Sequence, residues 1–167
     1  MIVPVCQSIN CFLLIWAGFT AELNSIPPMP PIEQMPIYAT AYNWNLGGIN
    51  CNEDCGEVAI GLKTSDDLLD KTAACPLAWL GRINTTVVTL PDGGEWYCID
   101  TFGDAHNQRP VFISHPYHGD LWVIRLDFAI TDPSAFEYNQ QLIYGWSSEW
   151  RPVNELSTEV DSLNEGN

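Results

Sequence analysis

The amino-acid sequence predicts one all-β domain, a small closed barrel of about six strands with one or two short helices. Three observations support this class. Short runs rich in β-branched and aromatic residues recur along the chain. Turn residues, chiefly Gly, Pro, Asn and Asp, separate these runs. No internal repeat is visible, so a solenoid or a propeller is not indicated.

The predicted strands follow the chain in order. The first alternates and is rich in β-formers, and the third is a long β-branched run. A hairpin turn, Pro91-Asp-Gly-Gly94, joins the third strand to its return strand. The expected strands are residues 37–42, 57–62, 82–90, 95–100, 121–130 and 146–153.

The run at 121–130 alternates clearly between two faces. Its even-numbered residues are all apolar and predict a core face. Val123, Arg125 and Asp127 point the other way and predict a cleft face. The expected core residues are Trp122, Ile124, Leu126 and Phe128.

Two helical segments and one loop complete the predicted domain. Ser65 fits the N-cap of a brief helical turn over 65–71, for which a solvated loop is the alternative. Pro133 stands near the first position of a short helix that runs to Ile143. Residues 101–120 show no periodicity and predict a long loop, and such a loop in a small domain is typically functional or flexible.

The chain divides into four parts. Residues 1–22 are apolar, and their centre has the length of a signal-peptide core but is too short for a stable membrane span. An uncleaved apolar arm and a mis-assigned start are the alternatives. Residues 23–36 are a Pro-rich linker, 37–155 the barrel domain and 156–167 an acidic flexible tail. This organisation predicts an extracellular or cell-envelope location.

The charge of the chain restricts its partners. Six Lys and Arg oppose twenty-one Asp and Glu, which gives a formal net charge of -15. Nucleic acids and anionic membrane surfaces are bound through basic patches, so neither is an expected partner. Abundant carboxylates and aromatic rings suit carbohydrate, although single rings are as well explained as core residues.

Cysteine usage agrees with a location outside the cytosol. Cys6 and Cys11 fall in the apolar segment, and the other four cysteines fit two disulfides. Four cysteines allow three pairings, of which we favour Cys51–Cys55 with Cys75–Cys98. A structural zinc site is the alternative, but it ordinarily needs two close Cys or His pairs, and only Cys51 and Cys55 form one among the cysteines.

Asp100 and Asp127 are the candidate catalytic residues. Each ends or lies in a strand-like run, and two neighbouring strands can bring two carboxylates to one cleft. His115 and His118 form a close pair on the intervening loop, but such pairs are more often solvated than metal-bound. We therefore predict no metal and no cofactor. Trp44, beside the end of the first strand, is the ring best placed to contact a sugar.

Seven short motifs in a fixed order resemble the double-psi β-barrel of the Asp-Asp-Asp, or 3D, domain. That domain occurs in bacterial and phage proteins and in enzymes of the membrane-bound lytic transglycosylase A type, and it is related to barwin-like and expansin-like barrels. The resemblance covers roughly residues 37–153. The motifs are Thr40-Ala-Tyr42, Gly47-Gly48, Ala59-Ile-Gly61, Ala74-Cys-Pro76, Trp79-Leu-Gly81, Cys98-Ile-Asp-Thr101 and Arg125-Leu-Asp-Phe128.

The resemblance implies a six-stranded double-psi barrel with Asp127 as catalytic acid and Asp100 beside it in the cleft. We expect the substrate to be bound by Tyr42, Trp44, Thr101 and Arg125. The sequence departs from the family after Asp100, where Thr101-Phe-Gly-Asp104 and a long insert replace a Gly-Gly segment. It also has no carboxylate at Asn43-Trp-Asn45, where the related endoglucanases carry their base, which argues against an inverting cellulase.

The resemblance further implies cleavage of peptidoglycan or another β-1,4-linked glycan. Asp127 would need a raised pKa, which apolar rings and the charge of Asp100 favour, whereas direct pairing with Arg125 would lower it. Arg125 has the alternative role of holding Asp100 ionised. Asp127 has the alternative role of a structural carboxylate. Two other functions stay open: a glycan-binding module without catalysis, and a phage or surface structural protein that reuses the barrel.

Overall fold

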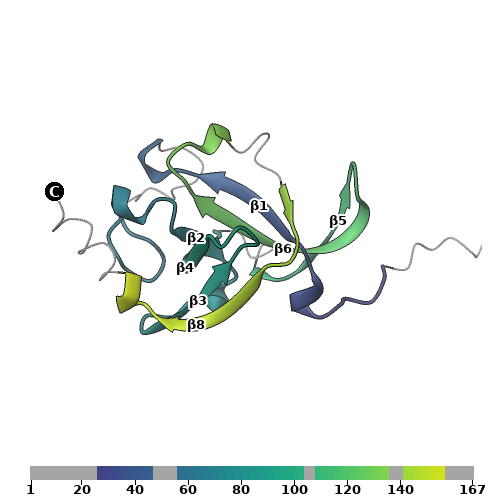
Figure 1. Cartoon of the computed structure of the whole chain (residues 1–167), viewed down its shortest axis with the longest axis horizontal. Coiled ribbons are helices and arrows are strands. Elements are labelled where there is room, and N and C mark those ends of the chain that lie inside the picture. Colours follow the sequence, from purple (N-terminus) through teal and green to yellow (C-terminus); the bar gives the residue numbers. More distant parts are fainter. Residues whose placement is uncertain (1–25, 47–55, 104–107, 136–140, 157–167) are drawn as a thin grey trace, which may run out of the picture.

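The computed structural model describes residues 26–46, 56–103, 108–135 and 141–156. The apolar segment, the Cys51–Cys55 pairing, the Gly47-Gly48 motif and almost all of the acidic tail lie outside the described residues. Within them, eight strands form one sheet that curls into a half-barrel (Figure 1). The strands are β1 Ile37–Tyr42, β2 Thr72–Cys75, β3 Asn84–Thr89, β4 Glu95–Thr101, β5 Val111–His115, β6 Gly119–Ala129, β7 Gln141–Ile143 and β8 Ser147–Pro152.

The predicted all-β class is confirmed. Among the described residues, helical structure is limited to short turns, including one helical turn at 154–156. Five described 3₁₀ turns have three residues each: η1 Ile32–Gln34, η2 Trp44–Leu46, η3 Asp66–Leu68, η4 Leu77–Trp79 and η6 Pro133–Ala135.

The order of strands in the sheet differs from their order in the chain. The path runs β7-β1-β6-β2-β4-β3-β8, and β5 pairs with β6 beside this path. The curled body consists of six strands in the order β1, β6, β2, β4, β3 and β8. Strand β7 extends the edge beside β1, and the β5–β6 hairpin projects from the body (Figure 1). Two parallel pairs, β1 with β6 and β2 with β4, are joined by the antiparallel pairing of β2 with β6. Strands that are distant in sequence therefore meet at the centre of the sheet.

Apolar side chains pack on both faces of the sheet. One core cluster centres on Ile124, Leu126 and Phe128, all almost fully buried. A second cluster lies on the face of Ala74 and Tyr42, where Val58 and Leu68 pack with these residues. Because successive residues of a strand face opposite sides, Ala73 and Ala74 belong to different clusters.

The predicted core face of β6 is largely confirmed. Ile124, Leu126 and Phe128 are buried, and Trp122 is partly buried. Val123, which we expected on a cleft face, is also fully buried. Its part of β6 is covered on both sides, so alternation stops marking the exposed face there.

Three predicted elements are wrong, and one strand was not predicted. Residues 57–62 form a turn closed by the single bridge between Glu57 and Lys63, not a strand. The expected loop at 101–120 contains β5 and the start of β6, with Gly119 at φ +70° in the turn that joins them.

The expected helix ending at Ile143 ends instead in β7, where pairing of Ile143 with Ile37 of β1 overrides the local helical signal. Finally, β2 was not predicted, because this central strand of four residues is too short to show a period.

Candidate functional site

A row of four residues crosses the centre of the sheet. Thr40 of β1 pairs with Asp127 of β6, Asp127 pairs with Ala74 of β2, and Ala74 pairs with Asp100 of β4. Side chains of directly paired residues point to the same face of a sheet. The structure therefore brings the two predicted aspartates to one face, on either side of a single alanine.

The small side chain of Ala74 leaves room between the carboxylates. With strands about 4.8 Å apart, the Cα atoms of Asp100 and Asp127 are roughly 10 Å apart, and both side chains extend over the same neighbour. The negative charge of Asp100 contributes to a raised pKa at Asp127. The two groups thus interact electrostatically across β2.

A β-bulge sets the direction of Asp100. Ala73 pairs with Cys98 but Ala74 pairs with Asp100, so Ile99 is skipped in the β2–β4 register. Without this shift Asp100 would pair with Cys75 and point to the opposite face. Bulges commonly redirect a side chain in this way beside functional sites. The regular alternation of β4 therefore could not have placed Asp100 from sequence.

Asp127 is a half-buried carboxyl with a pKa of about 6, above the ordinary 3.8. Burial is the largest cause of the increase, and the charge of Asp100 adds to it. Thr40 acts in the opposite direction, because its hydroxyl donates a hydrogen bond of 2.7 Å to Oδ1 of Asp127. Asp127 can therefore hold or release a proton near neutral pH, as a general acid and base must.

Asp100 is held by three donors. The hydroxyl of Tyr42 donates to Oδ2 at 2.8 Å, and the backbone amides of Ala59 and Thr101 donate to Oδ1 at 3.2 and 2.9 Å. Burial and the charge of Asp100 raise the pKa of Tyr42, so the phenol stays a hydrogen-bond donor. Asp100 therefore accepts three of the hydrogen bonds described here, whereas Asp127 accepts one, from the hydroxyl of Thr40.

Tyr42 and Trp44 are buried residues of the site. Both side chains are at most about one-twentieth exposed, and their rings pack edge to face with centroids 6.1 Å apart. Trp44 was predicted to offer a sugar-stacking surface, but its ring is buried and packs against the ring of Tyr42. Its position makes it a packing residue for the Tyr42–Asp100 contact.

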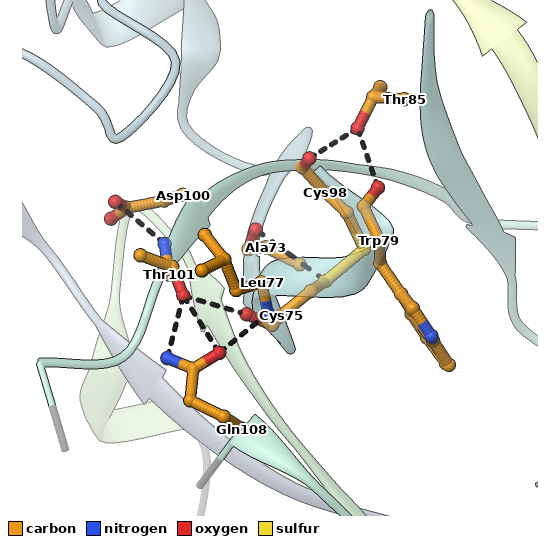
Figure 2. The surroundings of a disulfide bond; sticks show 9 residues. All are labelled: Ala73, Cys75, Leu77, Trp79, Thr85, Cys98, Asp100, Thr101 and Gln108. Carbon is orange, nitrogen blue, oxygen red and sulfur yellow. Dashed lines mark hydrogen bonds between the residues drawn. A yellow bond between two sulfur atoms is a disulfide. The ribbon is translucent and has the colours of Figure 1, made fainter. Parts of the chain in front are cut away.

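Thr101 and Arg125 lie next to the row. The hydroxyl of Thr101 donates to the carbonyl of Cys75 at 3.0 Å, and Nε2 of Gln108 donates to the same hydroxyl at 2.9 Å (Figure 2). The guanidinium of Arg125 lies 5.6 Å from the ring centre of Tyr38, its neighbour in β1. Both residues lie beside the aspartates. The backbone amide of Thr101 donates to Asp100, and Arg125 lies two residues before Asp127 on β6.

A disulfide lies directly behind the site. Cys75 and Cys98 are bonded with a Cα–Cα distance of 5.5 Å, which confirms one of the two predicted pairings (Figure 2). Cys75 follows Ala74, and Cys98 precedes the bulged Ile99. The disulfide therefore links β2 to β4 at the point where the register shift directs Asp100.

Two side chains that form hydrogen bonds in the site, those of Thr40 and Gln108, were not predicted as site residues. Thr40 lies two positions before Tyr42, so the alternation of β1 was a usable signal that both face one side. Gln108 gave no such signal. Its Oε1 accepts a hydrogen bond of 2.5 Å from the backbone amide of Leu77 (Figure 2). Its Nε2 donates to the carbonyl of Phe102 at 2.8 Å, so the side chain connects two segments beside Thr101.

The site is built from carboxylates and hydroxyls. In the part of the chain that the structure describes, no three His, Cys, Asp or Glu side chains are grouped to hold a metal ion. The rings of His115 and His118 lie 4.9 Å apart at the tip of the β5–β6 hairpin. None of the described helices combines the length and the apolar character that crossing a membrane requires.

Comparison with known proteins adds no relative. Neither the known family models, nor the curated proteins, nor the solved structures contain a match to this chain.

Proposed function

We propose that this protein cleaves the glycan strands of peptidoglycan in the manner of a lytic transglycosylase, with Asp127 as general acid and base. The observation that carries this proposal is that Asp127 and Asp100 face the same side of the sheet, where burial and the charge of Asp100 raise the pKa of Asp127 to about 6. Carboxyl groups with a pKa near neutrality are characteristic of acid catalysis at glycosidic bonds.

The proposed reaction needs only one carboxyl that changes role. Protonated Asp127 gives its proton to the glycosidic oxygen, and the bond from that oxygen to the anomeric carbon breaks. The resulting carboxylate then takes the proton from the 6-hydroxyl of the same sugar, whose oxygen bonds to the anomeric carbon and closes a 1,6-anhydro ring. Since the nucleophile is part of the substrate, no water and no second basic carboxylate are required.

The hydrogen bonds of Asp100 support this division of roles. An inverting hydrolase needs a second carboxylate free to activate water. Asp100 instead accepts three hydrogen bonds from Tyr42, Ala59 and Thr101. We assign it the role of a fixed charge that raises the pKa of Asp127, and assign Thr40 the role of orienting the Asp127 carboxyl.

We further propose that the domain is a double-psi barrel of the 3D type. The two parallel strand pairs joined through β2 and β6 support this assignment, as does the order of motifs in the sequence. The disulfide is compatible with an oxidising compartment, and we propose an extracellular or cell-envelope location on that basis.

A turbidity assay on purified peptidoglycan tests the proposed activity. The wild-type protein should clear the suspension, and mass spectrometry should find products lighter by one water than ordinary hydrolysis products. Asp127→Asn should abolish clearing, while Asp67→Asn, which removes an exposed carboxylate of η3, should not. Products with free reducing ends would contradict the transglycosylase mechanism.

A non-catalytic glycan-binding module is the second candidate. The hydrogen bond between Thr40 and Asp127 inside the sheet favours it, because such a bond also suits a purely structural carboxylate. Sedimentation of the protein with peptidoglycan, without any clearing, would support the module and would contradict the enzyme.

A further inference from the structure

Away from the aspartates, a cleft opens between the start of β3, the end of β8 and the segment around η3. Its volume is about 750 Å³, which is the size of pocket that takes a small organic ligand. Leu68, Val153 and Leu156 are buried and form an apolar floor. Ile83 also lines the cleft and is 81% exposed, so it offers an apolar contact surface at the opening.

The charge of this cleft is opposite to that of the chain. Lys63 and Arg82, two of the six basic residues, line it. The chain has twenty-one acidic residues, yet none of those that the structure describes lines the cleft. Asp66, close in sequence, accepts a hydrogen bond from Asn45 instead. Two cations above an apolar floor fit a ligand that carries carboxylates next to small apolar groups.

The polar groups of the cleft suit a peptide more than a simple fatty acid. Ser65, Asn84 and Asn154 add a hydroxyl and two amides to the lining. Such groups can pair with the N–H and C=O groups of a peptide backbone, whereas an alkyl chain offers them nothing to bond.

One short segment connects this cleft with the aspartate row. The amide of Ala59 donates to Asp100, and Leu62 and Lys63 of the cleft follow within four residues. Four residues span at most about 14 Å, and the bond from the amide of Val58 to the carbonyl of Leu62 folds the segment back. The Lys63 end of the cleft therefore lies within about 14 Å of the residue that holds Asp100, a separation that an extended peptide of four residues covers.

We propose that the cleft binds the acidic peptide stem of the glycan substrate. The inference rests on the proposed function and names the part of the substrate that the second site recognises. Free carboxylates of the peptide pair with Lys63 and Arg82, and its alanine methyl groups lie on Leu68, Val153 and Leu156.

The test uses a free, glycan-less peptidoglycan tetrapeptide titrated into the full chain, with binding followed by calorimetry and amide NMR. Lys63→Gln and Arg82→Gln should each weaken binding about threefold to tenfold. Ser65→Trp should abolish it by filling the cleft, and the Ser65 side chain caps no helix in this structure. Arg109→Gln, which removes an exposed cation outside the cleft, should leave binding unchanged.

Three further results decide the inference. A peptide with amidated carboxylates should bind at least tenfold more weakly, and equal binding would overturn the proposal. Saturable binding of lauric acid without binding of the peptide would also overturn it. Asp127→Asn should bind the peptide like the wild type, so a protein that binds peptide but clears no peptidoglycan refutes the proposed function alone, and one that clears but binds no peptide refutes this inference alone.

Discussion

Tyr42 and Asp100 connect the first and fourth strands of the chain across the centre of the sheet. The phenol at the end of β1 donates a 2.8 Å hydrogen bond to the carboxylate in β4, although β6 and β2 lie between these strands. Trp44 packs against the edge of the Tyr42 ring and restricts its position. The bond therefore fixes the geometry of the aspartate row from one side.

Tyr42→Phe should destabilise the protein by about 1.5–3 kcal/mol, because it removes a hydrogen bond to a charged group in a buried place. Urea unfolding measures the change. Tyr38→Phe is the matched control on the same strand, since it keeps the ring that faces Arg125. Equal losses in the two variants would show that the Tyr42–Asp100 bond contributes nothing specific.

Asp100→Asn should lower the pKa of Asp127 to a value between the ordinary 3.8 and about 6. The substitution removes the repulsive charge, but burial of Asp127, the larger cause, remains. Carboxyl-selective NMR on Asp127 measures the pKa directly. If Asp127 is the general acid, the alkaline limb of the pH–activity profile should move to lower pH by the same amount.

A matched charge removal tests the specificity of that shift. Asp92→Asn, in the exposed turn between β3 and β4, removes one negative charge but keeps the acceptor for the amide of Gly94. It should leave the pKa of Asp127 in place. A similar shift in both variants would mean that Asp100 acts only through the net charge of the chain.

Asp127→Asn should stabilise the fold at pH 8 by on the order of 1–2 kcal/mol. A pKa raised in the folded state means that ionised Asp127 costs more in the fold than in the unfolded chain. The contribution of Asp127 to the stability of the wild type is therefore fullest below pH 3.8 and is lost as pH rises through about 6. Asparagine keeps an acceptor for Thr40 without the charge.

Thermal unfolding from pH 3.5 to 8 checks this expectation. The advantage of Asp127→Asn should grow through the range between pH 4 and about 7 and then level off. Asp67→Asn, at an exposed position, should run parallel to the wild type. A variant that is less stable than the wild type at pH 8 would identify Asp127 as a favourable structural anion.

The strands that make the site were the part of the fold most visible in the sequence. The predicted strand 37–42 coincides with β1, and the runs at 95–100 and 121–130 correspond to β4 and β6 within two residues at their ends. These segments are long or strongly alternating, so local pattern and final structure agree. Asp100 and Asp127 were found because both lie in such segments.

The remaining parts of the site depend on long-range pairing, which local patterns do not encode. Ala74 lies in a strand of four residues, and its role between the aspartates appears only once β2 is placed between β4 and β6. The bulge at Ile99 is likewise a property of the pairing with β2. The same reasoning explains why β7 was expected to be helical: its pairing with β1 decides its structure.

The disulfide gives the last prediction. Cys75 and Cys98 close a loop with a sequence separation of 23 residues, so their double replacement by alanine should cost about 3 kcal/mol of stability. Because the disulfide links β2 and β4 beside the register shift, its loss should also free Asp100 from its place opposite Ala74. Urea unfolding measures the first effect, and the pKa of Asp127 by NMR measures the second. We expect that pKa to fall, since a displaced Asp100 repels less, and an unchanged pKa in the folded double variant would show that the strand pairing alone holds the row together.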